Sequence, residues 1–171
     1  YGEILHNNNG FRAPVLDVHE FLTNVGLSEG FSTQLKPIAK AVAMHDACHM
    51  IHGQGIQQQP RTLLAAIPDL ELREPMEAGV CCGSAGIYNL VQPEEAAELG
   101  TIKANDLSKT GAALVASANI GCTLQLRRHL QGRQPVHNPM ELLAASAGLH
   151  PLPSLKQSAF SAEVSGKRED R

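Results

Sequence analysis

The chain has 171 residues, 43% of them hydrophobic and 18% charged, and this length suits one packed domain with its own core. A net charge of −3 and the lack of tryptophan exclude the basic, aromatic surface with which proteins bind nucleic acid, so we expect no nucleic-acid partner. The sequence has no apolar run long enough for a membrane helix and its first residues do not resemble a signal peptide, which favours a cytoplasmic protein.

The spacing of apolar residues, together with residues that begin or end helices, predicts five helices. The clearest begins at Pro93, because proline suits a first helical turn, and ends at Lys109, which Gly111 follows closely. The five predicted ranges are 15–25, 60–67, 93–109, 122–131 and 139–148. The first two have one apolar face each and are expected to pack that face against the rest of the protein.

Short candidate strands lie between these helices. They cover residues 41–45, 70–74, 113–118 and 135–137. The near-continuous apolar run at 113–118 is typical of a strand that is buried on both sides. Alternation of strands and helices predicts the α/β class, with a three-layer, mostly parallel sheet and helices on both faces.

Three segments are predicted along the chain. Residues 1–35 form an N-terminal helical segment and linker, and residues 36–150 form the domain that contains all four cysteines. Residues 151–171 lack periodicity and end in charged residues, so we expect a disordered tail. The chain does not begin with methionine, which favours its being part of a longer protein.

The four cysteines are the most informative residues. Cys48 follows the first predicted strand, the adjacent Cys81 and Cys82 precede the third helix, and Cys122 follows the strand at 113–118. The carboxyl ends of parallel strands share one edge of a sheet, where such folds bind ligands, so the thiols are expected to converge there. A disulfide between the adjacent pair is disfavoured, because consecutive Cα atoms lie about 3.8 Å apart and disulfides need about 4.4 Å or more.

Thiols that converge in a reducing compartment are more often metal ligands than a disulfide framework. Tetrahedral zinc and an iron–sulfur cluster both remain open, as does the interpretation of the pair as two small hydrophobic side chains in a buried turn. Gly83 and Gly121 would let the backbone approach a bulky group. The stretch GSAGIYN lacks the lysine and the glycine spacing of a phosphate loop, so a nucleotide site is a weaker alternative.

Four stretches carry a resemblance to a known family: HDACH, CCGSAGIYNLVQPE, KTGAALVASANIGCTLQL and HNPMELLA. In order and spacing they resemble the second cysteine-rich CCG domain of the glycolate oxidase iron–sulfur subunit. That family is related to the CCG-containing subunits of heterodisulfide reductase and to lactate-utilisation proteins. The resemblance covers roughly residues 40 to 145. It implies that ferredoxin-like clusters and a first CCG repeat precede this part of the chain.

The resemblance also implies a ligand set. The family pattern places its first four cysteines on Cys48, Cys81, Cys82 and Cys122. Gln125 stands where the family's fifth cysteine would be, which argues against the disulfide chemistry of the heterodisulfide reductase branch. A 4Fe–4S cluster held by four thiolates is the implied cofactor, and zinc is the alternative.

The histidines near Cys48 are candidates either for ligands of a mixed His/Cys metal site or for a supporting role. His45, His49 and His52 surround Cys48, and His49 is preferred because it is adjacent to Cys48 and matches the family motif. It could hydrogen-bond a cluster sulfur and so tune the potential. His137 matches a late element of the family pattern, beside a predicted strand end, and a role in capping a helix is an equal alternative.

The resemblance implies an electron-transfer component of a glycolate oxidase or 2-hydroxy acid dehydrogenase complex, without a substrate site of its own. Its expected partners are flavin-containing dehydrogenase subunits, from which electrons pass toward quinone, with peripheral attachment to the membrane through the complex. The competing hypothesis is a non-redox CCG scaffold that binds zinc or no metal and docks partner subunits.

Overall fold

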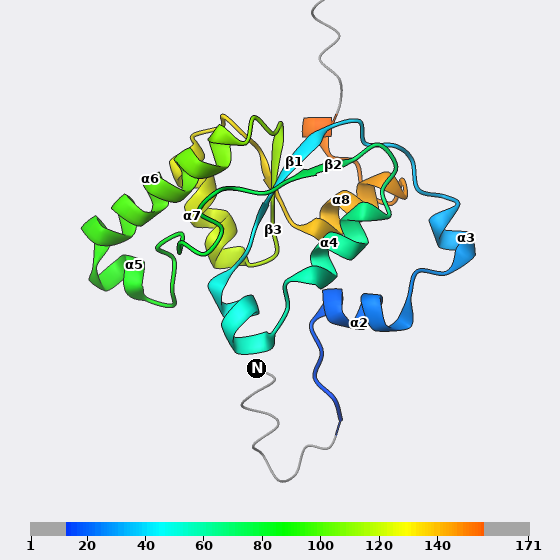
Figure 1. Ribbon diagram of the computed structural model, residues 1–171, viewed down its shortest axis with the longest axis horizontal. Helices are drawn as coiled ribbons and strands as arrows, with labels where there is room; N and C mark the ends of the chain where they lie inside the picture. Colours follow the sequence, from blue (N-terminus) through cyan, green and yellow to red (C-terminus); the bar gives the residue numbers. More distant parts are fainter. Residues whose placement is uncertain (1–12, 156–171) are drawn as a thin grey trace, which may run out of the picture.

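The sheet of the computed structural model, which describes residues 13–155, is entirely parallel within that range (Figure 1). Its strands are β1 (Ala41–His45), β2 (Glu71–Arg73), β3 (Leu114–Ser117) and β4 (Val136–His137). They lie in the order β2-β1-β3-β4. Each lies within a range that the sequence predicts, and the α/β class with a parallel sheet is confirmed.

Helices cover both faces of this sheet, as the sequence predicts (Figure 1). They are α2 (Val18–Val25), α3 (Glu29–Ser32), α4 (Gln58–Ala65), α5 (Tyr88–Val91), α6 (Pro93–Lys109), α7 (Ile120–Leu130) and α8 (Pro139–Ser146). A π-helix, η1 (Met50–Gln54), follows β1, and a short 3-10 helix, η2 (Pro153–Leu155), follows α8. Four elements, α3, α5, η1 and η2, have no counterpart among the predicted helices, and all are five residues or shorter.

Alternate residues of the central strands point to opposite layers of the core. Val42 of β1 packs with Leu64 of α4 and Leu142 of α8, on one face. Its neighbour Ala43 packs on the other face, in the cluster that includes Leu107 of α6 and the two buried cysteines. The sheet is therefore buried on both sides, and the thiols belong to the layer of α6 and α7.

Two helices begin and end at residues other than the predicted ones. Helix α7 begins at Ile120, two residues earlier than expected, because the side chain of Asn119 accepts a hydrogen bond from the amide of Cys122. Cys122 consequently lies within the first turn of α7. Helix α4 begins at Gln58 and ends at Ala65, before Pro68 can interrupt it.

The apolar face of α2 does not pack as expected. Phe21 and Val25 are exposed, with 67% of Val25 accessible, whereas the buried residue of the helix is His19. The His19 ring is held by Asp17 at 2.6 Å, which also caps the helix. The amphipathic pattern therefore predicted the helix correctly. Its prediction that the apolar face would be buried was wrong.

Residues 151–155, at the start of the predicted tail, belong to the packed domain. Leu152 is buried in the same core layer as α8, and Ser154 in η2 hydrogen-bonds His137 at 2.7 Å. The rest of that tail and the first twelve residues lie outside the described range. Within residues 13–155, no helix has both the length and the hydrophobicity that crossing a membrane requires.

Candidate metal centre

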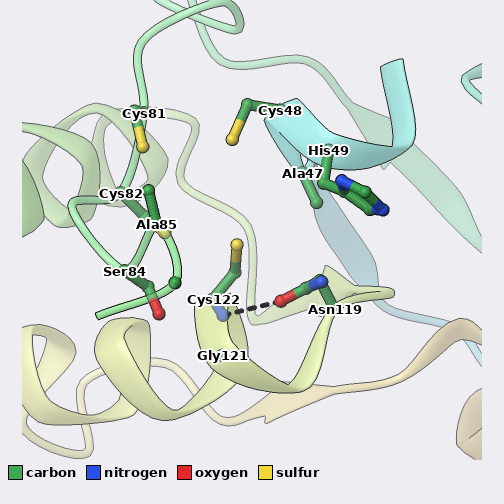
Figure 2. A pocket seen from close by; sticks show the side chains of 11 residues that line it. Ala47, Cys48, His49, Cys81, Cys82, Ser84, Ala85, Asn119, Gly121 and Cys122 are labelled. Carbon is green, nitrogen blue, oxygen red and sulfur yellow. Dashed lines mark hydrogen bonds between the residues drawn. The ribbon is translucent and has the colours of Figure 1, made fainter. Parts of the chain in front are cut away.

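All four cysteines line one cavity at the carboxyl edge of the sheet. Cys48 lies between β1 and η1, Cys81 and Cys82 lie in the loop between β2 and α5, and Cys122 lies in α7. The cavity has a volume of about 480 Å³, and the four thiols are free of disulfide bonds. Figure 2 shows the sulfur atoms of Cys48, Cys81 and Cys122 directed toward the same space. The convergence predicted from the topology is thus present.

The thiols differ in burial. Cys82 and Cys122 are buried in the core layer of α6 and α7, whereas Cys48 and Cys81 are partly exposed. The site therefore has an inner side within the protein and an outer side that solvent, or another protein, can approach. The exposed side chains of Ile87, Leu90 and Val91 follow directly on the loop that lines the cavity.

His45, which the sequence ranks below His49, lies close to the buried thiols. It is the last residue of β1, is 1% exposed, and has one ligand atom within 4.8 Å of the sulfurs of Cys82 and Cys122. Neither of its ring nitrogens has a hydrogen-bond partner among the described residues. The signal lay in the alternation of β1, since His45 shares the face of Ala43, which the two buried thiols also occupy.

His49, the histidine preferred from the sequence, lines the cavity but is exposed. Its ring is turned away from the sulfur atoms in Figure 2. Between the two histidines flanking Cys48, the structure therefore directs His45, and not His49, toward the thiols.

The two glycines act through close packing. The amide of Gly83 donates to the sulfur of Cys81 at 3.3 Å, and the residue has a φ of +81°. A Cβ on Gly83 would collide with the carbonyl of Ala96 in α6. A Cβ on Gly121 would come within 2.9 Å of the Ser84 hydroxyl, so Gly121 lets the cysteine loop approach α7. Both glycines thus allow close packing between the cysteine loop and the helices, and the predicted approach to a bound group stays a prediction.

Two buried charges on α6 hold the segment that leads into the cysteine pair. Lys103 is 0% exposed, donates to the carbonyl of Glu77, and forms an ion pair with Asp106 at 3.9 Å. Asp106 accepts hydrogen bonds from the amides of Met76 and Glu77 at 3.2 and 3.0 Å. Burial lowers the pKa of Lys103, and the charge of Cys82 opposes that shift. A cation at this position suits a site that gathers thiolates.

A second buried network braces the loop of Cys48. Arg61 of α4 forms a two-pronged contact with Asp46, at 2.8 Å for each prong, and also binds Glu74 at 2.7 Å. The hydrogen bonds with Glu74 and then Asp46 raise the pKa of Arg61 further. Asp46 is thus held by a structural partner.

The thiols are not equivalent as acids. The neighbouring Cys122 side chain lowers the pKa of Cys82, and His45 lowers it further. The pKa of Cys122 is raised, because its thiol favours the proton when Cys82 carries the charge. Burial raises the pKa of Cys81, although the Gly83 amide acts in the opposite sense. One thiolate is therefore favoured at Cys82, and a cation bound by both would have to displace the proton of Cys122.

Gln125 and His137 are not among the residues that line the cavity. Gln125 is buried, and its amide donates to the carbonyl of Ala96 at 3.0 Å, which joins α7 to α6. His137 binds Ser154, and its other nitrogen lies 3.4 Å from Glu141. Gln125 reaches the site only indirectly, through the part of α6 against which Gly83 packs.

The donor set fits a metal–sulfur group. Soft thiolates and imidazole are the ligands of zinc and of iron–sulfur clusters. In the described range, His45, Cys82 and Cys122 are the one group of three such side chains close enough together for a single ion. The four thiols together surround a larger space, which favours a group with several metal atoms over one tetrahedral ion.

Comparison with known proteins gives related sequences. The chain is 36% identical over 138 residues to a subunit of the fumarate reductase (CoM/CoB) of Methanothermobacter marburgensis, covering 78% of this chain and 27% of that protein. It is 35% identical over 114 residues to a probable glycolate oxidase iron-sulfur subunit of Bacillus subtilis, covering 64% and 26%.

A third relative is a subunit of the dihydromethanophenazine:CoB–CoM heterodisulfide reductase of Methanosarcina barkeri, 29% identical over 141 residues, covering 79% of this chain and 34% of that protein. The chain thus spans about a quarter to a third of the length of these relatives. The profile of the cysteine-rich domain, CCG, matches residues 42–127, from β1 through most of α7. That range includes His45 and all four cysteines, and the chain belongs to the cysteine-rich CCG domain family.

Proposed function

We propose that this domain holds an iron–sulfur centre and transfers electrons within an oxidoreductase complex. The observation that carries the proposal is the convergence of Cys48, Cys81, Cys82 and Cys122, from three separate parts of the chain, on one cavity. Relatives named as iron–sulfur or reductase subunits support a redox role. The group held there would be a 4Fe–4S cluster, which takes up and gives back single electrons.

Each part of the chain has a task in this proposal. The four thiolates hold the cluster, and the Gly83 amide, directed at the sulfur of Cys81, stabilises negative charge there. The buried Lys103 compensates thiolate charge on the inner side. Cys48 and Cys81, being partly exposed, lie on the side from which electrons enter or leave.

We further propose that the domain belongs to a glycolate oxidase or other 2-hydroxy acid dehydrogenase complex. Electrons would come from a flavoprotein subunit and pass toward quinone, and the whole would lie in the cytoplasm or at the inner face of the membrane. The relative from Bacillus subtilis supports this assignment by its name. The exposed Ile87, Leu90 and Val91 beside the cavity provide apolar surface for a partner protein.

Electron flow through the purified chain tests the proposal. Dihydroflavin mononucleotide should reduce the anaerobic chain, and a water-soluble quinone should reoxidise it, both followed by absorbance in a stopped-flow instrument. Cys48→Ser should abolish both phases while the circular dichroism spectrum stays unchanged. If the serine variant lowers only the stability and leaves the phases intact, the cysteines have no redox role.

A zinc-binding scaffold is the second candidate, and one observation favours it. His45, Cys82 and Cys122 already lie at distances that suit a single ion. Zinc bound without sulfide, and no reduction by flavin, would establish this alternative.

A further inference from the structure

The inner side of the cavity is formed by a triangle of donors from three elements. His45 ends β1, Cys82 lies in the loop before α5, and Cys122 lies in the first turn of α7. One ligand atom from each lies within 4.8 Å of the other two, and all three residues are buried. Two ligands on one zinc ion lie about 3.5–4 Å apart, given bond lengths of about 2.0 Å to nitrogen and 2.3 Å to sulfur.

The His45 ring lies beside the two buried thiols. Both of its nitrogens are buried without a hydrogen-bond partner in the described part of the chain. Burying a polar group without a partner is unfavourable, so native structures keep few such groups. Ser117, which is opposite His45 in the parallel register, has a buried hydroxyl that is also unpartnered. This end of the sheet therefore has two buried polar side chains without partners among the described residues.

We propose that His45 is a direct nitrogen ligand of the metal centre, together with Cys82 and Cys122 on the inner side. With Cys48 and Cys81 on the outer side this makes five protein ligands, one more than the four irons of a 4Fe–4S cluster, so one iron would carry two of them. The inference deepens the proposed function and rests on its premise that the cavity holds metal. It assigns the additional ligand to β1, whereas the family pattern would place it at Gln125, whose amide is engaged with Ala96.

A neutral imidazole changes the properties of the centre. It adds a ligand without adding negative charge, so the reduced state is disfavoured less than with five thiolates, and the reduction potential is higher. His45→Cys should therefore lower the potential if the thiolate binds. His45→Gln should weaken metal retention by at least about 10–100-fold. Losses of that size follow when a residue that only supports the metal ligands is removed.

The test is pulsed electron paramagnetic resonance on the anaerobically purified, reduced chain, grown with ¹⁴N- or ¹⁵N-histidine. X-ray absorption at the iron and zinc edges counts nitrogen and sulfur neighbours in the same wild-type samples, without any substitution. His45→Gln is compared with His49→Gln, since His49 also lines the cavity but is exposed and turned away. Circular dichroism and thermal unfolding report whether each variant is folded.

The expected result is a histidine nitrogen coupling that changes with the isotope, is lost in His45→Gln and persists in His49→Gln. Two findings together would overturn the ligand assignment: an iron–sulfur signal without nitrogen coupling, and only sulfur neighbours around the metal in wild type. The electron-transfer proposal would still stand. Zinc with one nitrogen neighbour that disappears in His45→Gln would uphold the ligand assignment and overturn the cluster. Failure of the wild-type chain to retain either metal would overturn both.

Discussion

The backbone amide of Gly83 points at the sulfur of Cys81, 3.3 Å away, and the same glycine packs against the carbonyl of Ala96 in α6. The hydrogen bond and the packing both depend on a φ of +81°, which side-chain-bearing residues rarely adopt. The cysteine loop can thus lie this close to α6 because residue 83 is a glycine.

Gly83→Ala should therefore damage both stability and metal retention. The left-handed φ alone costs about 1–3 kcal/mol, and the contact with Ala96 adds to it because backbone cannot move aside easily. The measurements are urea unfolding and metal content. Gly86→Ala is the matched control, since Gly86 also has a positive φ but has open space around its Cα. Equal losses in the two variants would show that the contact with Ala96 is unimportant.

Arg61→Met should destabilise the domain by about 3–5 kcal/mol, because it leaves the buried carboxylate of Asp46 without its charged partner. Urea unfolding measures the loss. Arg73→Met is the control, because the Arg73–Glu71 pair is exposed and should contribute little. A similar, small effect in both variants would contradict the assignment of Asp46 and Arg61 as the brace of the Cys48 loop.

Gln125→Met should lower the free energy of unfolding by about 1 kcal/mol while the metal-to-protein ratio stays the same. The substitution removes the hydrogen bond to Ala96 and retains most of the side-chain volume. Unfolding curves and metal analysis on the same preparation distinguish the two effects. Loss of metal from a variant of normal stability would instead place Gln125 at the centre.

Acid should weaken the domain through His137. Burial lowers the pKa of His137 from its ordinary value of 6.5, so the unfolded chain takes up the proton first as the pH falls below about that value. The free energy of unfolding should consequently decrease between about pH 6.5 and the lower pKa of the folded state. His137→Gln should show a shallower decrease than wild type over this range in urea titrations at successive pH values. Identical slopes would mean that His137 does not titrate differently in the two states.

Much of the fold follows from the sequence because its signals are local. Strands that are buried on both faces are encoded as short apolar runs, and Pro93 and Asn138 mark the starts of α6 and α8. The convergence of the thiols also follows, since parallel topology brings loops after successive strands to one edge.

Other features depend on neighbours that the sequence does not name. The role of His45 requires knowing which face of β1 is covered by α6 and α7. In the sequence, Lys103 is an ordinary polar residue of a long helix. Its burial becomes evident in the structure, where it donates to the carbonyl of Glu77. In α2, packing selects His19 for burial in place of the apolar stripe.

The central claim is that four thiolates hold an iron–sulfur centre, and the most direct measurement is the content of iron, zinc and acid-labile sulfide in the chain purified without oxygen. We expect iron and sulfide in roughly equal amounts, about four of each per chain for a 4Fe–4S cluster, and a visible band that bleaches with dithionite. Zinc without sulfide, or protein that retains neither metal under these conditions, would contradict the claim.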